Sequence, residues 1–469
     1  MYRITDSYEE NVRATDEVLR VKENFDLIRK QLQIGQDEMT LYYLDGFVQD
    51  GSMQKLMMSF LALKGLEQGP KAAEDFLRKQ VASVEAEITQ DAQLLLHMVL
   101  SGAVIAFGST FGAQALIIDA RSYPARDTQE PEGDRVMRGA RDGFVETLIN
   151  NTALIRRRIR DPQLTMEYIS VGEKSRTDLV LCYLNGTADP ELLDCLRKKL
   201  NSVKTDALVL GHESVAEVLI QNHWYNPFPK IRYTERPDAA AAQILEGSVI
   251  LLVDNAPTAM ILPTSIFDFM QETNDFYFTP LTGSYLRIMR HIVFLLTLFM
   301  IPVWYLLVRN AEILPAWMDF LIPQNQGRIP LFAQILLAEF ALDALRMASL
   351  NTPSMLSNSL SAVGGLILGD FAVDIGWLTP EVILYIAFVA IANFTQRSYE
   401  LGYAFKFLRL MLVTLVWLFN FWGFGAGMVL IVILLLTNKT VNGTRSYLYP
   451  LIPFNGPALM SLFVRKKKI

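Results

Sequence analysis

A charge-free run of seventeen or so residues decides the fold class of this chain: Ile292-Val293-Phe294-Leu295-Leu296-Thr297-Leu298-Phe299-Met300-Ile301-Pro302-Val303-Trp304-Tyr305-Leu306-Leu307-Val308. Arg287 and Arg290 precede the run, and Arg309 follows it. A helix rises about 1.5 Å per residue, so some twenty residues cross a bilayer core of about 30 Å. Trp304 and Tyr305 are typical of an interfacial aromatic belt. The stretch predicts a membrane-spanning helix over 286–308.

The composition is the average of two unlike parts. Hydrophobic residues make up 51% of the 469 residues and charged residues 20%. Charges occur every few positions up to about residue 282 and become rare from Ile288 onward. We therefore expect a soluble α/β N-terminal part followed by an all-α polytopic transmembrane bundle. The expected divisions are 1–135, 136–283, a transmembrane domain over 284–445 with about four to six crossings, and a short basic tail over 446–469.

Several classes of function are disfavoured. The formal net charge of -6 argues against nucleic-acid binding. Cys182, Cys195 and the four histidines are not spaced as metal ligands, so no metal site is predicted. No phosphate loop, nucleophile elbow or other catalytic constellation occurs, so we expect neither an enzyme nor a cofactor. The polar N-terminus has no signal-peptide pattern, which predicts that the soluble part stays on the cytoplasmic side.

The soluble part contains an internal repeat. The strand-and-turn stretch 41–46 recurs at 181–186, and each is followed by a helical pattern. The hairpin pattern of 102–107 and 115–118 recurs at 247–252 and 260–262, at nearly the same offset. We therefore predict two repeated α/β subdomains, at about 25–125 and 145–270, each with a strand, a helix and a hairpin. The Pro- and Gly-containing stretch 121–134 predicts a surface linker between them.

A run of arginines follows the linker, comprising Arg156, Arg157, Arg158 and Arg160. One interpretation is a contact with anionic lipid headgroups or with the acidic face of a partner. The other is the solvated C-terminal end of a helix, where cations are favourable. The residues alone do not choose between the two.

The stretch 331–350 carries charges on one helical face. Glu339, Asp343 and Arg346 are spaced i, i+4 and i+7, and the other faces are apolar. Ionisable groups in a span are costly and mark ion paths or polar cavities, so these are candidate pore-lining residues of a spanning or re-entrant helix. The alternative is an amphipathic helix that lies in the membrane interface.

Three further apolar segments follow. In 360–377, Gly365 and Gly369 form a small-xxx-small pair that permits close helix packing. Asp370 and Asp374 share one helical face. They are either further pore-lining candidates or residues at the membrane interface. A short span is expected at 381–394. The stretch 407–437 is too long for one straight crossing, and Asn420 with the nearby glycines predicts a break into two helices.

The distribution of basic residues bears on topology. The basic C-terminus Arg465-Lys466-Lys467-Lys468 and the soluble part should both lie in the cytoplasm, which requires an even number of crossings. Six crossings also put Arg397, Lys406 and Arg409 inside and agree better with the positive-inside rule. Four crossings, with 331–350 re-entrant, is the alternative.

Ordered motifs along nearly the whole chain resemble one known family. They are Arg138-Gly139-Ala140-Arg141-Asp142-Gly143-Phe144-Val145-Glu146, Leu154-Ile155-Arg156-Arg157-Arg158-Ile159-Arg160-Asp161-Pro162, Ala188-Asp189-Pro190-Glu191-Leu192, Thr234-Glu235-Arg236-Pro237, Leu245-Glu246-Gly247, the Glu339, Asp343 and Arg346 stripe, and Ser398-Tyr399-Glu400-Leu401. This set is similar to the A subunits of spore germinant receptors, the GerA family of endospore-forming Firmicutes. Glu173-Lys174-Ser175-Arg176-Thr177-Asp178 and the ending after Tyr447-Leu448-Tyr449-Pro450 look more like the stage V sporulation protein AF branch.

The resemblance implies a multi-pass protein of the spore inner membrane that acts in germination. It implies a homo-oligomer, a pentameric ring whose membrane domains enclose a pore for monovalent cations, in contact with the lipid bilayer and other spore germination membrane proteins. The branch implies a channel subunit that assists or amplifies germinant-triggered ion release. The alternatives are the A subunit of a nutrient germinant receptor and a non-conducting signalling or assembly protein.

Overall fold

The chain forms two compact units in the computed structural model. The N-terminal unit comprises Met1–Gln221 and Ile231–Thr264, and the C-terminal unit comprises Asn222–Lys230 and Ser265–Ile469. The structure describes residues 3–82, 85–122, 139–203, 211–220, 225–272, 275, 278–324, 327–351, 369, 371–396, 398–443 and 446–465. The predicted linker from residue 123 to 134 and most of the predicted segment 360–377 lie outside these residues.

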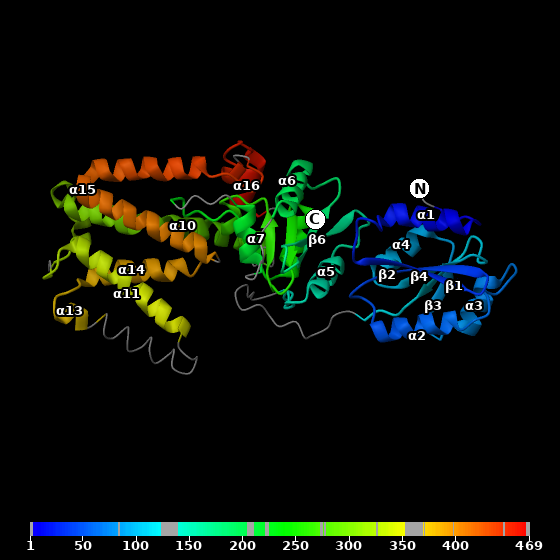
Figure 1. The fold of residues 1–469 in the computed structure, drawn as a ribbon. Helices are drawn as coiled ribbons and strands as arrows, with labels where there is room; N and C mark the ends of the chain where they lie inside the picture. The colour runs from blue at the N-terminus through cyan, green and yellow to red at the C-terminus, as the bar shows by residue number, and fades with distance from the viewer. Residues whose placement is uncertain are drawn as a thin grey trace. The chain divides into compact units, whose positions relative to one another are not determined.

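The first repeat is a five-stranded antiparallel sheet of order β1-β2-β4-β5-β3. Its strands are β1 (Leu27–Ile34), β2 (Asp37–Leu44), β3 (Ala86–Thr89), β4 (Val104–Gly108) and β5 (Ala115–Ile118). Alternating side chains point to opposite faces of a sheet. One face packs against α1 (Tyr8–Leu19) and α4 (Ala92–Leu100), and the other against α2 (Asp50–Leu61) and α3 (Ala72–Gln80) (Figure 1).

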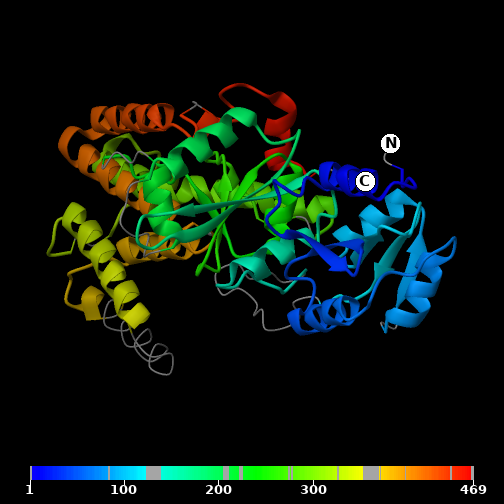
Figure 2. The ribbon, with the colours of Figure 1, turned by 45° about the vertical axis from the view of Figure 1, so that its right-hand side comes forward.

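The second repeat has the same strand order, β6-β7-β9-β10-β8. Its strands are β6 (Leu164–Val171), β7 (Thr177–Leu184), β8 (Arg232–Thr234), β9 (Val249–Val253) and β10 (Ala259–Leu262). α5 (Leu148–Arg156) and α8 (Pro237–Leu245) share a core with one face. α6 (Pro190–Asn201) packs against β6 and against α7 (His212–Leu219). Figure 2 shows the ribbon of this repeat from a second direction.

This matching order confirms the duplication and the α/β class, but the predicted content of each repeat was incomplete. Each sheet has five strands, whereas a strand and a hairpin were expected. The missed strands are at or near sheet edges, and β1 reads Leu-Ile-Arg-Lys-Gln-Leu-Gln-Ile, with three exposed polar residues in a row. Edge strands need less apolar sequence because one side faces solvent. β3 and β8 are too short to show the alternation of apolar and polar residues by which a strand is predicted.

The C-terminal unit is helical. Its longer elements are α10 (Pro280–Arg309), α11 (Leu331–Asn351), α14 (Pro380–Asn393) and α15 (Tyr399–Thr437). Two of these, α10 and α15, are long and apolar enough to cross a membrane. The shorter elements are η1 (Asp268–Met270), η2 (Ala311–Ile313), η3 (Ala316–Leu321), α13 (Ala372–Asp374), η5 (Ser446–Leu448) and α16 (Gly456–Phe463).

α15 is two helices that meet at a break, as the sequence predicted. Asn420 has φ 55° and ψ -129°, which is not helical. The chain turns back at this point, and the two arms run side by side (Figure 1). A Cβ on Gly423 would overlap the carbonyl oxygen of Leu415, and one on Gly427 would lie 2.5 Å from Cδ2 of Leu412. Gly423 and Gly427 therefore allow the arms to touch, as small-xxx-small pairs do elsewhere.

Candidate functional site: a buried ionic quartet

Four charged side chains meet inside the C-terminal unit. α11 contributes Glu339 and Asp343, and the first arm of α15 contributes Lys406 and Arg409. We call these four residues the ionic quartet. The i, i+4 spacing on α11 and the i, i+3 spacing on α15 put each pair on one helical face, so two charged faces pair across the two helices.

Glu339 is held mainly by Arg409. The Nε and Nη2 atoms of Arg409 both donate to Oε1 of Glu339, at 2.9 and 2.7 Å. Nη1 of Arg409 donates to the carbonyl oxygen of Thr297 on α10, at 2.6 Å. Hydrogen bonds to ionised groups are roughly twice as strong as neutral ones. This guanidinium therefore links three helices, α10, α11 and α15, at one point.

Lys406 joins the two carboxylates. Its Nζ lies 3.3 Å from Oε2 of Glu339 and forms an ion pair with Oδ2 of Asp343. It also donates to the backbone carbonyl oxygen of Glu339 at 3.2 Å. Two formal negative charges thus face two formal positive charges, so the quartet is neutral as a whole.

The members of the quartet differ in exposure. The side chains of Glu339, Arg409 and Lys406 are 6%, 7% and 10% exposed, whereas that of Asp343 is 32% exposed. A buried ion pair gains little over an apolar replacement, but removing one partner leaves an uncompensated charge. Asp343 is therefore the most exposed member of the quartet.

The structure describes three other predicted site residues of this unit. The guanidinium of Arg346 lies over the rings of Phe394 and Tyr403, with 5.3 and 5.7 Å to the centroids. Asp374 is exposed at the end of α13. Gly369 is described, and within the described part of the chain nothing lies within 4 Å of a Cβ built on it. Gly365 and Asp370 lie outside the described residues.

Sequence reasoning missed two of the quartet's four members. Lys406 and Arg409 enter the sequence prediction only through the positive-inside rule, although both interrupt an apolar helix. Their spacing complements that of Glu339 and Asp343, and this was the available signal.

A second polar cluster caps the break in α15. Nη1 of Arg309, at the end of α10, donates to the carbonyl oxygens of Val416 and Trp417, both at 2.6 Å. The side-chain amides of Asn310 and Asn420 exchange two hydrogen bonds, at 2.7 and 2.8 Å. The end of a helix leaves carbonyl groups without helical partners, and cations are favourable there. The end of α10 supplies those partners for the first arm of α15.

In the N-terminal unit, the first arginine of the predicted run is an internal residue. Arg156 is 2% exposed, and its Nε and Nη2 donate to the two carboxylate oxygens of Asp26, both at 2.9 Å. It also donates to the carbonyl oxygen of Leu164 and to Oδ1 of Asn24. Asp26 and Asn24 belong to the first repeat, so Arg156 ties the two repeats together. We call this contact the seam.

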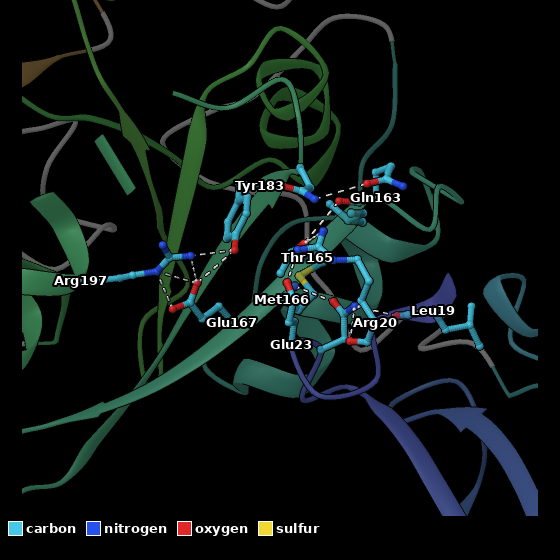
Figure 3. Close-up of polar contacts among 12 residues, drawn as sticks. Leu19, Arg20, Glu23, Gln163, Thr165, Met166, Glu167, Tyr183 and Arg197 are labelled. Atoms are coloured by element: carbon cyan, nitrogen blue, oxygen red, sulfur yellow. Dashed lines mark hydrogen bonds and ion pairs between the residues drawn. The ribbon is translucent and has the colours of Figure 1, made fainter. Parts of the chain in front are cut away.

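Figure 3 shows more of the seam, where the loop after α1 meets β6. Nη1 of Arg20 donates to Oγ1 of Thr165 at 2.8 Å, and the amide of Met166 donates to Oδ1 of Asn24 at 2.8 Å. Ala153 lies in the core of the first repeat, although α5 belongs to the second. The seam is thus partly apolar and partly ionic.

The remaining arginines of the run differ from Arg156. Arg158 donates to Asp142 at 2.7 and 2.5 Å, whereas Arg157 and Arg160 are exposed at the surface. Beyond them, Arg197 and Glu167 form a polar cluster with the buried Tyr183, which Figure 3 also shows. The hydrogen-bonded carboxylate of Glu167 raises the pKa of Arg197. Burial is the main cause that raises the pKa of Tyr183.

Comparisons with known proteins agree with the motifs. The family described as Bacillus/Clostridium GerA spore germination protein matches residues 18–468. Stage V sporulation protein AF of Bacillus subtilis (strain 168) is 39% identical over 447 residues, which are 95% of this chain and 90% of that protein. Spore germination protein KA of Bacillus subtilis (strain 168) is 27% identical over 98% of this chain and 85% of that protein.

One solved structure is also similar. The N-terminal domain of the A subunit of the Bacillus megaterium spore germinant receptor GerK3 is 22% identical, with a TM-score of 0.41. The match covers 55% of this chain and 96% of that chain.

Proposed function

Because this chain belongs to the GerA family of spore germination proteins, we propose that it is a subunit of an oligomeric cation channel that assists germinant-triggered ion release. In this proposal it lies in the spore inner membrane, with the N-terminal unit on the core side. The oligomer is a pentameric ring, and monovalent cations pass through the C-terminal units. The similarity to a stage V sporulation protein supports a role beside the germinant receptors.

The observation that carries the proposal is the ionic quartet. It lies in the same unit as α10 and α15, the two helices that are long and apolar enough to cross a membrane. Ionisable side chains inside such a unit are costly, and they mark ion pathways or polar cavities. Carboxylate rings are a common cation filter, and a ring of subunits would repeat Asp343 around its axis.

The geometry also suggests how conduction is controlled. In the described conformation every charge of the quartet is compensated, so Glu339 offers no free carboxylate to a cation. Asp343 is one-third exposed and pairs with Lys406. We propose that separation of α11 from α15 releases Asp343 from Lys406 and opens the polar face to cations. Arg346, Asp370 and Asp374 are further candidates for the same path.

Two measurements on one preparation of the purified full-length protein test this function. The first is the oligomeric mass in mild detergent, and the second is potassium efflux from vesicles that contain the protein. Asp343→Asn should change the flux at least several-fold, because it removes the accessible carboxylate. Asp319→Asn, at an exposed acidic residue of η3, is the matched control and should leave the flux unchanged.

The alternatives make different predictions. A strictly monomeric protein whose vesicles hold their potassium would contradict the channel. A non-conducting signalling or assembly protein is the function that this result would favour, and full compensation of the quartet's charges is the observation consistent with it. An A subunit of a nutrient receptor would show flux only when a germinant nutrient and its partner subunits are added.

A further inference from the structure

The segment Tyr449–Val464, which we call the C-terminal apolar segment, is largely uncovered although it is apolar. The exposed fractions are 45% for Leu451, 45% for Ile452, 74% for Phe454, 57% for Met460 and 41% for Val464. No Asp, Glu, Lys or Arg occurs from Ser446 to Val464. Large exposed apolar patches on a protein mark a surface that contacts a membrane, a ligand or another protein.

The same segment is fixed on its other side to the first turns of α10. Nη1 of Arg287 donates to the carbonyl oxygen of Ser461 at 2.6 Å, and the amide of Arg465 donates to Oγ of Ser284 at 3.0 Å. The rings of His291 and Phe463 are 4.9 Å apart, and Leu462 is buried. α16 therefore has one packed face and one open face.

These contacts fix the level of the segment along α10. They involve residues from Ser284 to His291, and the charge-free run of α10 begins at the next residue, Ile292. At the same level, Arg290 donates to both carboxylate oxygens of the buried Asp275, at 2.8 and 2.9 Å. Such a cluster of charges immediately before an apolar run is typical of the membrane boundary. The C-terminal apolar segment thus lies where α10 would enter the hydrocarbon.

We propose that the C-terminal apolar segment lies in the plane of the membrane surface, with Phe454 and Met460 in the acyl boundary, and that the basic residues which follow it in the sequence favour anionic phospholipids. α16 has eight residues. At about 1.5 Å per residue it is too short to cross a core of about 30 Å. An apolar face next to several basic residues is the pattern of an interfacial anchor.

The charge pattern favours a lipid surface over a second copy of the chain. The exposed stretch has no acidic or basic residue with which to specify a protein partner, and the charged residues that follow it in the sequence are all basic. A run of basic residues is attracted to an anionic lipid surface. The inference goes beyond ion conduction, because it holds whether or not the C-terminal unit conducts.

The test measures the depth of a fluorescent label at this segment in the full-length protein. In a Cys195→Ser background, Phe454→Cys is labelled with an environment-sensitive dye and reconstituted in phosphatidylcholine vesicles with or without phosphatidylglycerol. The expected result is a blue-shifted emission that lipids with a nitroxide near the headgroup quench strongly, and more strongly when phosphatidylglycerol is present. Glu173→Cys, at an exposed position of the N-terminal unit, is the control and should show a water-like, unquenched emission.

A second variant separates the lipid contact from simple burial. Replacing Arg465 and the three following lysines by glutamine should abolish the effect of phosphatidylglycerol. Two results would overturn the proposal: a water-like emission at residue 454 in both lipids, or a blue-shifted emission that no nitroxide lipid quenches, which would indicate a protein partner. Potassium flux in the same vesicles is scored separately, so a non-conducting protein leaves this test intact.

Discussion

Glu339 shows how strongly one residue's role depends on what faces it. Its helical spacing on α11 predicts a pore-lining carboxylate, but Arg409 and Lys406 surround it from α15. Replacing both partners of a buried pair by apolar groups is often tolerated, whereas replacing one partner strands the other charge. The quartet therefore behaves as one unit in mutagenesis.

Glu339→Gln should destabilise the C-terminal unit by about 3–5 kcal/mol. The substitution removes the negative charge that compensates the buried guanidinium of Arg409. Thermal unfolding of the detergent-solubilised full chain measures the effect. Glu312→Gln, an exposed carboxylate in η2, is the matched control and should change the unfolding temperature little. The double variant Glu339→Gln with Arg409→Met should recover part of the loss; additive losses would show that the two residues do not interact.

Asp45 gives a pH-dependent prediction in the N-terminal unit. Burial raises the pKa of Asp45, and Asp50 and Asp26 raise it further, against a hydrogen bond from the Gly46 amide that lowers it. A carboxylate whose pKa is higher in the folded than in the unfolded state lowers the stability of the fold at a pH where it is ionised. It has no such effect at a pH below its unfolded-state pKa.

Asp45→Asn should therefore stabilise the unit at neutral pH, by less than about 1 kcal/mol for a half-buried group. The advantage should shrink as the pH falls through the raised pKa of Asp45. Unfolding followed between acidic and neutral pH measures it, with the exposed Glu17→Gln as control. An advantage that is the same at every pH would mean that the charge is not its cause.

At the residue scale, the sequence located the acidic half of the quartet and left out the basic half. Helical spacing places Glu339, Asp343 and Arg346 on one face, but it carries no information about which other helix that face meets. The same limit applies to Arg156. A run of arginines is usually solvated, and only the distant Asp26 makes one of them an interior residue.

The helical hairpin of α15 is the element whose sequence and geometry agree best. Its excess length and its glycines predicted a break, and the break occurs at Asn420. The caps were not predictable, because Arg309 and Asn310 belong to α10, which pairs with the break only in the folded unit.

Gly423→Ala should destabilise the hairpin by about 1–3 kcal/mol, since the new methyl group would overlap the carbonyl oxygen of Leu415 on the opposite arm. Gly425→Ala provides a matched control two residues away. Nothing lies within 4 Å of its Cβ position within the described part of the chain, and alanine is the better helix former by roughly 0.5–1 kcal/mol. Thermal stability of the two variants should thus change in opposite directions. Equal losses would mean that the arms do not pack as described.

At the scale of the N-terminal unit, the seam decides whether the two repeats unfold together. Arg156→Met should cost about 3 kcal/mol or more, because Asp26 would remain buried without its partner. Hydrogen exchange of the full-length protein measures the loss as faster exchange in both β6 and the loop before β1. Arg160→Met, at an exposed position of the same run, should leave that exchange unchanged. Loss of protection confined to one repeat would show that the seam does not couple them.

The division of the chain into an α/β part and a helical part was predictable from the sequence, as was the duplication. Both depend on patterns within single elements: the apolar strands β2, β4, β7 and β9, and the apolar runs of α10 and α15. The edge strands and the seam were not predictable, because each is defined by a neighbour from another part of the chain. For the same reason only the acidic residues of the quartet, on α11, were predictable as site residues, because their partners lie on α15.

The quartet also sets an order of events during biosynthesis. Lys406 lies 67 residues after Glu339 along the chain. A ribosome adds roughly 5–20 residues per second, so the acidic pair is made roughly three to thirteen seconds before its cations exist. A helix carrying uncompensated carboxylates is expensive to leave in hydrocarbon for that time. If the C-terminal unit spans the membrane as proposed, we therefore expect α11 to stay at the bilayer surface after its synthesis and to reach its final position only when α15 is made.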